Sequence, residues 1–134
     1  MTIRLAAPHD IAILSRHDQH IRPSEWENLL PFGRVYVAEE DGVFAGWLRY
    51  GLFWDNTPFL NMLYLLEPYR AKGYGKQFIT TWEADMKAAG YTTVMTSTPS
   101  DETSQHFYRQ LGYKVIGGFL LEPDPFELIL SKCL

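Results

Sequence analysis

An almost unbroken apolar segment, residues 59–66, runs into a glycine turn that carries cations, and a helix-forming segment follows at once. The turn, Arg70-Ala-Lys-Gly-Tyr-Gly-Lys76, holds three cations in a chain whose net charge is −4. At such a turn the first N–H groups of the helix lack internal partners, and the helix dipole adds partial positive charge. Glycines let a phosphate approach those groups closely. The stretch therefore predicts a phosphate site, and a pyrophosphate suits it best.

Two common phosphate loops fit this stretch poorly. A dinucleotide-binding fingerprint needs a third glycine where the chain has Phe78. A Walker A loop needs glycine in place of Arg70 and serine or threonine in place of Gln77. ATP and NAD are therefore poor first candidates. A glycine-containing helix start with solvated cations, and no ligand, also stays open at this point.

Length and composition indicate one globular domain, residues 1–134. Apolar residues make up 46% of the chain and aromatic residues 15%, which is enough for a core without disulfides or metals. No apolar run approaches the roughly 20 residues of a membrane span. The single Cys133 and the lack of a signal-peptide pattern at the start predict a cytoplasmic protein. The negative net charge argues against nucleic acid as a partner.

The periodicity of apolar residues predicts a mixed α/β chain in the order β-α-α-β-β-β-α-β-α-β-β. Helices are expected to begin at Asp10, at Pro23, just after Gly75, and at 99–101. A strong hairpin turn stands at Asp41-Gly42. The expected strands are residues 3–5, 34–39, 43–50, 59–66, 92–98, 113–121 and 126–130.

Two motifs, in order and at the expected spacing, resemble the GNAT superfamily of N-acyltransferases. The first is Arg70-x-x-Gly73-x-Gly75 with Pro68 upstream, which is similar to that family's acyl-CoA-binding motif. The second is Ser104-Gln-His-Phe-Tyr-Arg-Gln-Leu-Gly-Tyr113, which is similar to its late helix and aromatic pair. The order of elements matches over essentially the whole chain, although only residues 60–115 carry specific motifs.

The resemblance implies the GNAT-like acyl-CoA N-acyltransferase fold, with a central mixed sheet of about seven strands flanked by about four helices. It also implies an N-acetyltransferase that takes acetyl-CoA as acyl donor and lets a primary amine attack directly, without a metal. Tyr108 falls at the family's usual general acid, which protonates the leaving thiolate. Leu65 or Leu66 would offer a backbone N–H to the thioester carbonyl. The implied cofactor-binding residues are Leu65, Leu66, Arg70, Ala71, Lys72, Gly73, Tyr74, Gly75, Lys76 and Ser104.

Several points stay open at the level of sequence. Many relatives have asparagine where this chain has Asp101, so Asp101 either contacts CoA or only caps its helix. No general base is assigned, because Asn61 is not a base and Glu67 has the character of a surface residue. Thr96 and Thr98 could position waters. A non-catalytic CoA-binding or acyl-CoA-binding module of the same fold is the alternative to an enzyme.

The acceptor is a small-molecule or peptide amine that the sequence does not identify. Aromatic residues of the early helices and the long hairpin could line its pocket, with nearby acids attracting a cation, or they could simply form the core. His17 and His20 lie three apart without further ligands, so no metal site is expected. A homodimer through the terminal apolar segment 126–130 is compatible with the sequence. The candidates for the pocket are Trp26, Tyr36, Trp47, Tyr50, Phe53 and Trp54, with Glu25, Glu39 and Asp55.

Overall fold

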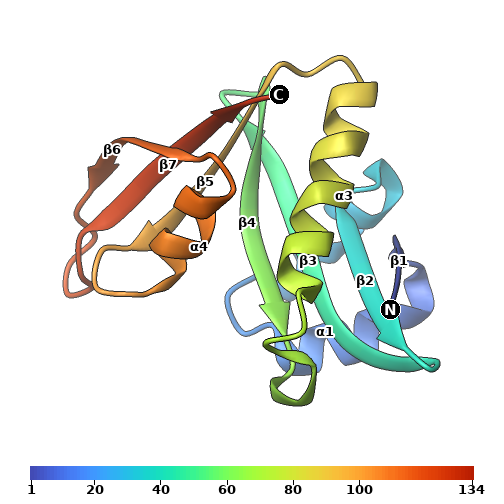
Figure 1. The fold of residues 1–134 in the computed structure, drawn as a ribbon. Helices are drawn as coiled ribbons and strands as arrows, with labels where there is room; N and C mark the ends of the chain where they lie inside the picture. The colour runs from blue at the N-terminus through green and yellow to red at the C-terminus, as the bar shows by residue number, and fades with distance from the viewer. The chain divides into compact units, whose positions relative to one another are not determined.

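The computed structural model describes residues 1–134 and contains one mixed sheet of seven strands, in the order β1-β2-β3-β4-β5-β7-β6 (Figure 1). Its strands are β1 (Thr2–Leu5), β2 (Val35–Glu40), β3 (Val43–Phe53), β4 (Thr57–Leu65), β5 (Thr93–Pro99), β6 (Lys114–Phe119) and β7 (Glu127–Cys133). Four α-helices accompany the sheet: α1 (Ile11–His17), α2 (Trp26–Leu29), α3 (Tyr74–Ala88) and α4 (Ser104–Gln110). Single 3-10 turns are η1 (Pro8–Asp10), η2 (Pro23–Glu25), η3 (Leu30–Phe32) and η4 (Glu67–Tyr69).

The chain forms two compact units, and strands β3 and β4 run through both. The first unit comprises residues 1–51 and 62–78, and the second comprises residues 52–61 and 79–134. Helix α3 begins in the first unit and continues in the second.

The first unit is built on antiparallel pairing of β1 with β2 and of β2 with β3. The β2–β3 pairing contains a bulge after Ala38. Ala38 pairs with Gly46, but the next residue, Glu39, pairs with Phe44, so Ala45 has no partner in the register. The hairpin turn at Asp41-Gly42 has positive φ at both residues, as a tight two-residue turn requires. One core cluster lies on this sheet and draws on α1, α2, β2 and β3; its buried members are Leu14, Trp26, Val35, Val37 and Trp47.

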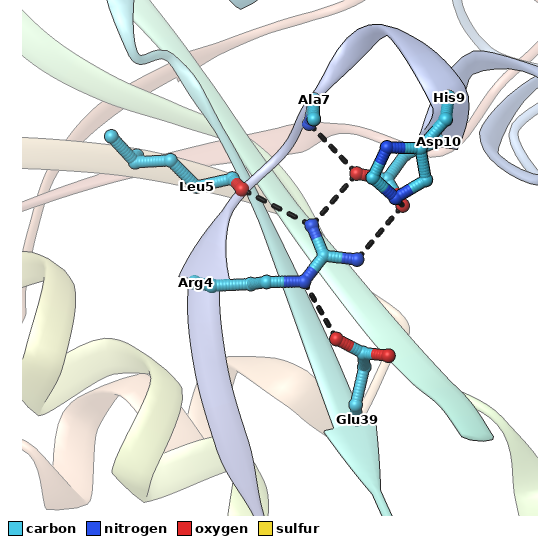
Figure 2. Close-up of polar contacts among 6 residues, drawn as sticks. All are labelled: Arg4, Leu5, Ala7, His9, Asp10 and Glu39. Carbon is cyan, nitrogen blue, oxygen red and sulfur yellow. Dashed lines mark hydrogen bonds and ion pairs between the residues drawn. The ribbon is translucent and has the colours of Figure 1, made fainter. Parts of the chain in front are cut away.

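An ion-paired network joins the start of the chain to β2 (Figure 2). Arg4 donates through two nitrogens to the carboxylate of Asp10, at 2.8 and 2.9 Å, and through Nε to Glu39 at 2.6 Å. The same carboxylate accepts the N–H of Ala7 at 2.7 Å. Asp10 precedes α1 as predicted, but its side chain does not cap α1 and instead closes the preceding turn η1.

The second unit combines parallel and antiparallel pairing. Strand β4 pairs in parallel with β5 at Phe59 and Leu60, and β5 pairs antiparallel with β7. Figure 1 shows β7 between β5 and β6, so the last strand of the sequence lies inside the sheet and β6 forms its edge. The segment 126–130, which the sequence left compatible with a dimer contact, belongs mostly to an internal strand, because β7 is paired on both sides.

The structure confirms the predicted fold and shifts several boundaries. Strand β3 extends to Phe53, and β4 starts at Thr57, so the connecting turn is shorter than expected. The second helix is broken into 3-10 turns around four α-helical residues, because Pro23 and Pro31 bracket it closely. The apolar face predicted for the third helix is confirmed, since its four members are all buried: Phe78, Ile79, Trp82 and Met86.

Candidate active site

The glycine turn ends in a helix start whose backbone donors face outward from the helix. The N–H of Gln77 donates to the carbonyl of Gly73 at 3.1 Å, which is the first bond of the helical ladder of α3. The N–H groups of residues 74–76 precede this bond and therefore have no acceptor within the helix. The N–H groups of Tyr74 and Gly75 and the positive end of the helix dipole therefore favour an anion at this point.

The backbone before that helix has a left-handed conformation at two positions separated by Lys72. Gly73 has φ +80°, with open space where a Cβ would lie, and Ala71 has φ +60°. Successive N–H groups in such alternating conformations form a concave anion-binding nest. A left-handed alanine costs roughly 1 kcal/mol, and strain of this kind concentrates at functional sites. Lys72 is exposed between the two, so its charge is available beside the nest.

Arg70 is tied to the end of β4. Its Nε donates to the carbonyl of Leu65 at 2.8 Å, and its guanidinium lies 5.0 Å from the ring centre of Tyr64. The residue is nevertheless exposed, so its charge stays at the surface of the turn. Arg70 therefore orients the strand end as well as adding positive charge.

Leu65 ends β4 and Leu66 follows it, and their backbone N–H groups point in different directions. The N–H of Leu66 donates to the carbonyl of Ala45 on β3 at 2.9 Å. Consecutive N–H groups of an extended chain point to opposite edges, so that of Leu65 points away from β3. Gly46 makes this arrangement possible, because a Cβ there would lie 2.3 Å from the carbonyl oxygen of Tyr64.

Tyr74 is the first residue of α3, and its hydroxyl interacts with Glu40 at the end of β2. A hydrogen bond with the Glu40 carboxylate raises the pKa of the Tyr74 hydroxyl. Lys76 on the same turn is also engaged in an interaction.

Tyr108 belongs to the second unit and lies on α4 with its ring enclosed. Burial raises the pKa of Tyr108 to about 12, and a hydrogen bond with Thr96 partly offsets that effect. The ring makes edge contacts with Phe107 and Tyr113, at centroid distances of 5.2 and 5.5 Å. At neutral pH the phenol is therefore protonated and held in one orientation, which are two properties of a proton donor.

Ser104 opens α4 half-buried, and its hydroxyl is hydrogen-bonded to that of Thr98 on β5. The residue at the cap position of α4 is Thr103, so of the two alternatives left open for Asp101, capping of this helix is excluded. Asp101 is exposed and lies in the turn that connects β5 to α4.

Two buried polar networks were missed at the level of sequence. In the first unit, Asp18 accepts from Trp47 Nε1 at 2.9 Å and from Arg49 Nε at 2.7 Å. In the second, Glu83 accepts from the Tyr113 hydroxyl at 2.7 Å and from Lys132 at 3.0 Å. An arginine inside the apolar strand 43–50 was a signal for the first network, but its partner is 31 residues away.

Most of the aromatic residues considered for an acceptor pocket form the core. Trp26, Tyr36, Trp47 and Tyr50 are buried, whereas Trp54 is 85% exposed. Of the acids, Glu39 is paired with Arg4, whereas Glu25 and Asp55 are exposed. Asn61 and Glu67 are exposed as well.

The structure contains no group of three His, Cys, Asp or Glu side chains placed to hold a metal ion, and no helix long and apolar enough to cross a membrane.

The mixed sheet of seven strands with its four helices has the fold of GNAT acetyltransferases. The model of the acetyltransferase (GNAT) family matches residues 5–113, and the chain belongs to this family. No curated protein matches it.

Solved structures of low sequence identity share the fold. Ard1 from Thermoplasma volcanium is 13% identical, with a TM-score of 0.85, 99% of this chain and 97% of that one covered. A GNAT acetyltransferase from Bacillus cereus is 21% identical, with a TM-score of 0.77 and coverages of 98% and 96%. Naa50 from Arabidopsis thaliana, solved with the bisubstrate analogue CoA-Ac-MVNAL, is 14% identical, with a TM-score of 0.78 and coverages of 98% and 97%.

Proposed function

We propose that the protein is an N-acetyltransferase that moves an acetyl group from acetyl-CoA to a primary amine by direct attack. The observation that carries the proposal is the start of α3 at the glycine turn, where the N–H groups of Tyr74 and Gly75 have no acceptor within the helix and Arg70 and Lys72 are exposed nearby. This arrangement suits the pyrophosphate of CoA, and the turn resembles the acyl-CoA-binding motif of the GNAT family, to which the chain belongs. The CoA-containing complex of the Naa50 neighbour is consistent with this choice of donor.

The residues of this chain would share the work as follows. Amides of residues 72–76 would hold the pyrophosphate, and the segment 63–66 would bond the pantetheine arm as an added strand. The N–H of Leu65 would polarise the thioester carbonyl, since Leu66 already donates to Ala45. Tyr108 would donate a proton to the leaving thiolate. Ser104 would lie along the arm at the start of α4.

The base that takes the proton of the amine is not part of the proposal. The ring of Tyr108 contacts the rings of Phe107 and Tyr113, and neither residue can act as a base at neutral pH. We infer that the amine binds partly neutral or loses its proton to water. The same observation favours the second candidate, a CoA-binding module without turnover. Whether the protein is an N-acetyltransferase or a CoA-binding module, the free and exposed Cys133 is consistent with a cytoplasmic location.

Thermal unfolding with acetyl-CoA, CoA, ATP and NADH tests the donor. A ligand at 100 times its dissociation constant adds about 2.7 kcal/mol, which corresponds to roughly several degrees in Tm. We expect stabilisation by both CoA species alone. No shift with either of them would contradict the proposal, and a shift with ATP or NADH alone would indicate a different phosphate site.

Transfer is tested by the release of free CoA thiol over a panel of amines: peptides with free N-termini, lysine, polyamines and aminoglycosides. For Tyr108→Phe we expect kcat to fall by about 10²-fold or more, while acetyl-CoA affinity is kept, because the phenyl ring retains the packing and loses only the proton. Phe107→Leu is a matched packing control. Tight binding of acetyl-CoA with no transfer to any amine would identify the non-catalytic module.

A further inference from the structure

Tyr113 is anchored to α3 through a buried carboxylate of the second unit. Its hydroxyl donates to Glu83 Oε2 at 2.7 Å. Tyr113 is 2% exposed and Glu83 is 8% exposed, so water does not replace the bond between them. Lys132 on β7 donates to the other oxygen of the same carboxylate at 3.0 Å and balances its charge. The hydroxyl end of the Tyr113 side chain is therefore fixed to the helix.

The same residue contacts Tyr108 twice. The N–H of Tyr113 donates to the carbonyl oxygen of Tyr108 at 3.1 Å. The two rings also meet edge to face, with their centroids 5.5 Å apart and their planes at 68°. Phe107, whose ring contacts Tyr108 at 5.2 Å, has no polar atom in its side chain, so no hydrogen bond fixes that ring. Tyr113 is therefore the ring through which a polar anchor reaches Tyr108.

Packing alone does not require a polar anchor at this place. A phenylalanine would fill the space of the Tyr113 ring. Burying a carboxylate with its lysine partner also costs free energy of desolvation, and apolar residues of similar volume are often at least as stable. What the hydrogen bond to Glu83 adds is direction, because a ring that is held at its hydroxyl is restricted in how it can tilt against its neighbour.

We propose that Tyr113 is a positioning residue for Tyr108, and that Glu83 holds it in that role. The inference rests on the proposed function, in which Tyr108 is the proton donor. In that reaction the amine nitrogen bonds to the thioester carbon, and the carbon–sulfur bond breaks with its electron pair going to sulfur. Sulfur takes the proton of Tyr108, the new amide gives its extra proton to water, and water then reprotonates Tyr108. A misplaced phenol slows this proton transfer, since an error of about 1 Å in a reacting geometry costs roughly 10²-fold in rate.

The test compares Tyr113→Phe with Lys132→Met. Each variant removes one of the two side-chain hydrogen bonds to the Glu83 carboxylate, so each should lower the free energy of unfolding. Only Tyr113→Phe frees the ring from Glu83, whereas methionine at position 132 keeps an apolar stem beside that ring. For Tyr113→Phe we expect kcat to fall by about 10-fold with an unchanged KM for acetyl-CoA, and for Lys132→Met we expect kcat to be kept. In a Tyr108→Phe background, Tyr113→Phe should cost nothing further.

A second measurement requires no turnover. In protein with ¹³C-labelled tyrosine rings, the Tyr108 signals are assigned by their loss in Tyr108→Phe, and exchange between the two sides of the ring gives its flip rate. We expect slow flipping in the wild type and in Lys132→Met, and faster flipping in Tyr113→Phe. A ring that flips as fast in the wild type as in Tyr113→Phe overturns the proposal whatever the activity.

The activities separate this inference from the proposed function. If the wild type transfers acetyl groups and Tyr113→Phe has the same kcat, the positioning role is overturned. An equal loss of kcat in Tyr113→Phe and Lys132→Met overturns it as well, because activity then follows stability alone. Binding of acetyl-CoA without transfer in the wild type overturns only the proposed function.

Discussion

At the scale of single residues, Gly46 on β3 lies against the backbone at the end of β4. Its ideal Cβ would lie 2.3 Å from the carbonyl oxygen of Tyr64 and 3.1 Å from the Cα of Leu65, both of them backbone atoms. Backbone cannot rotate away as the end of a flexible side chain can. The end of β4 and the orientation of the Leu65 N–H therefore depend on the absence of a side chain at this position.

We expect Gly46→Ala to lower the free energy of unfolding by about 1–3 kcal/mol, as overpacking does. Because the strand end must shift, acetyl-CoA affinity should fall as well. Chemical denaturation and calorimetric titration measure the two effects. Gly117→Ala is the control, since its Cβ would meet no atom within 4 Å and its φ is not left-handed. Equal behaviour of both variants would contradict the role given to Gly46.

At the scale of elements, the connection after α1 is held by one carboxylate. Asp18 lies just past the end of α1 and accepts the N–H of His20 at 3.0 Å, besides its bonds to Trp47 and Arg49 on β3. Asp18 and Arg49 are both buried, so neither charge has water to replace its partner. The connection from α1 to η2 is thereby fixed to the sheet.

Asp18→Asn removes the charge and keeps the shape of this contact. Breaking a buried ion pair from one side leaves the other charge unpaired, which costs roughly 3–5 kcal/mol. We expect a loss of that size in urea denaturation, and partial recovery in the double variant with Arg49→Met. The exposed Glu27→Gln should have no measurable effect. A double variant no more stable than Asp18→Asn alone would argue against the unpaired arginine as the cause.

The elements themselves could largely be predicted from sequence, and their partners could not. The apolar stripe of α3 and the turn residues at Asp41-Gly42 are local patterns, so each carries its own signal. The position of β7 between β5 and β6 depends on segments that share no local pattern. The same holds for the hydrogen bond from the Tyr113 hydroxyl to Glu83 on α3. The glycine turn was predicted because all of its parts are consecutive in the chain.

At the scale of the whole molecule, we expect the free energy of unfolding to decrease at acidic pH. The bonds from Arg4 and the Ala7 N–H lower the pKa of Asp10 below its usual value. Burial alone would raise the pKa of Asp18, but bonds from Arg49, the His20 N–H and Trp47 outweigh it and lower this pKa too. Both carboxylates contribute to the first unit, and each must stay ionised to keep its arginine partner.

The direction of the pH effect follows from those two shifts. Each folded pKa lies below the unfolded value of about 3.9, so the unfolded state binds more protons in acid. The stabilisation is fully present above about pH 5 and is lost as the pH falls through the two folded pKa values. We expect the free energy of unfolding, measured in urea from pH 7 to pH 3, to fall steeply below pH 4, and Asp18→Asn to reduce that slope. An acid slope as steep in Asp18→Asn as in the wild type would show that Asp18 is not one of the groups responsible.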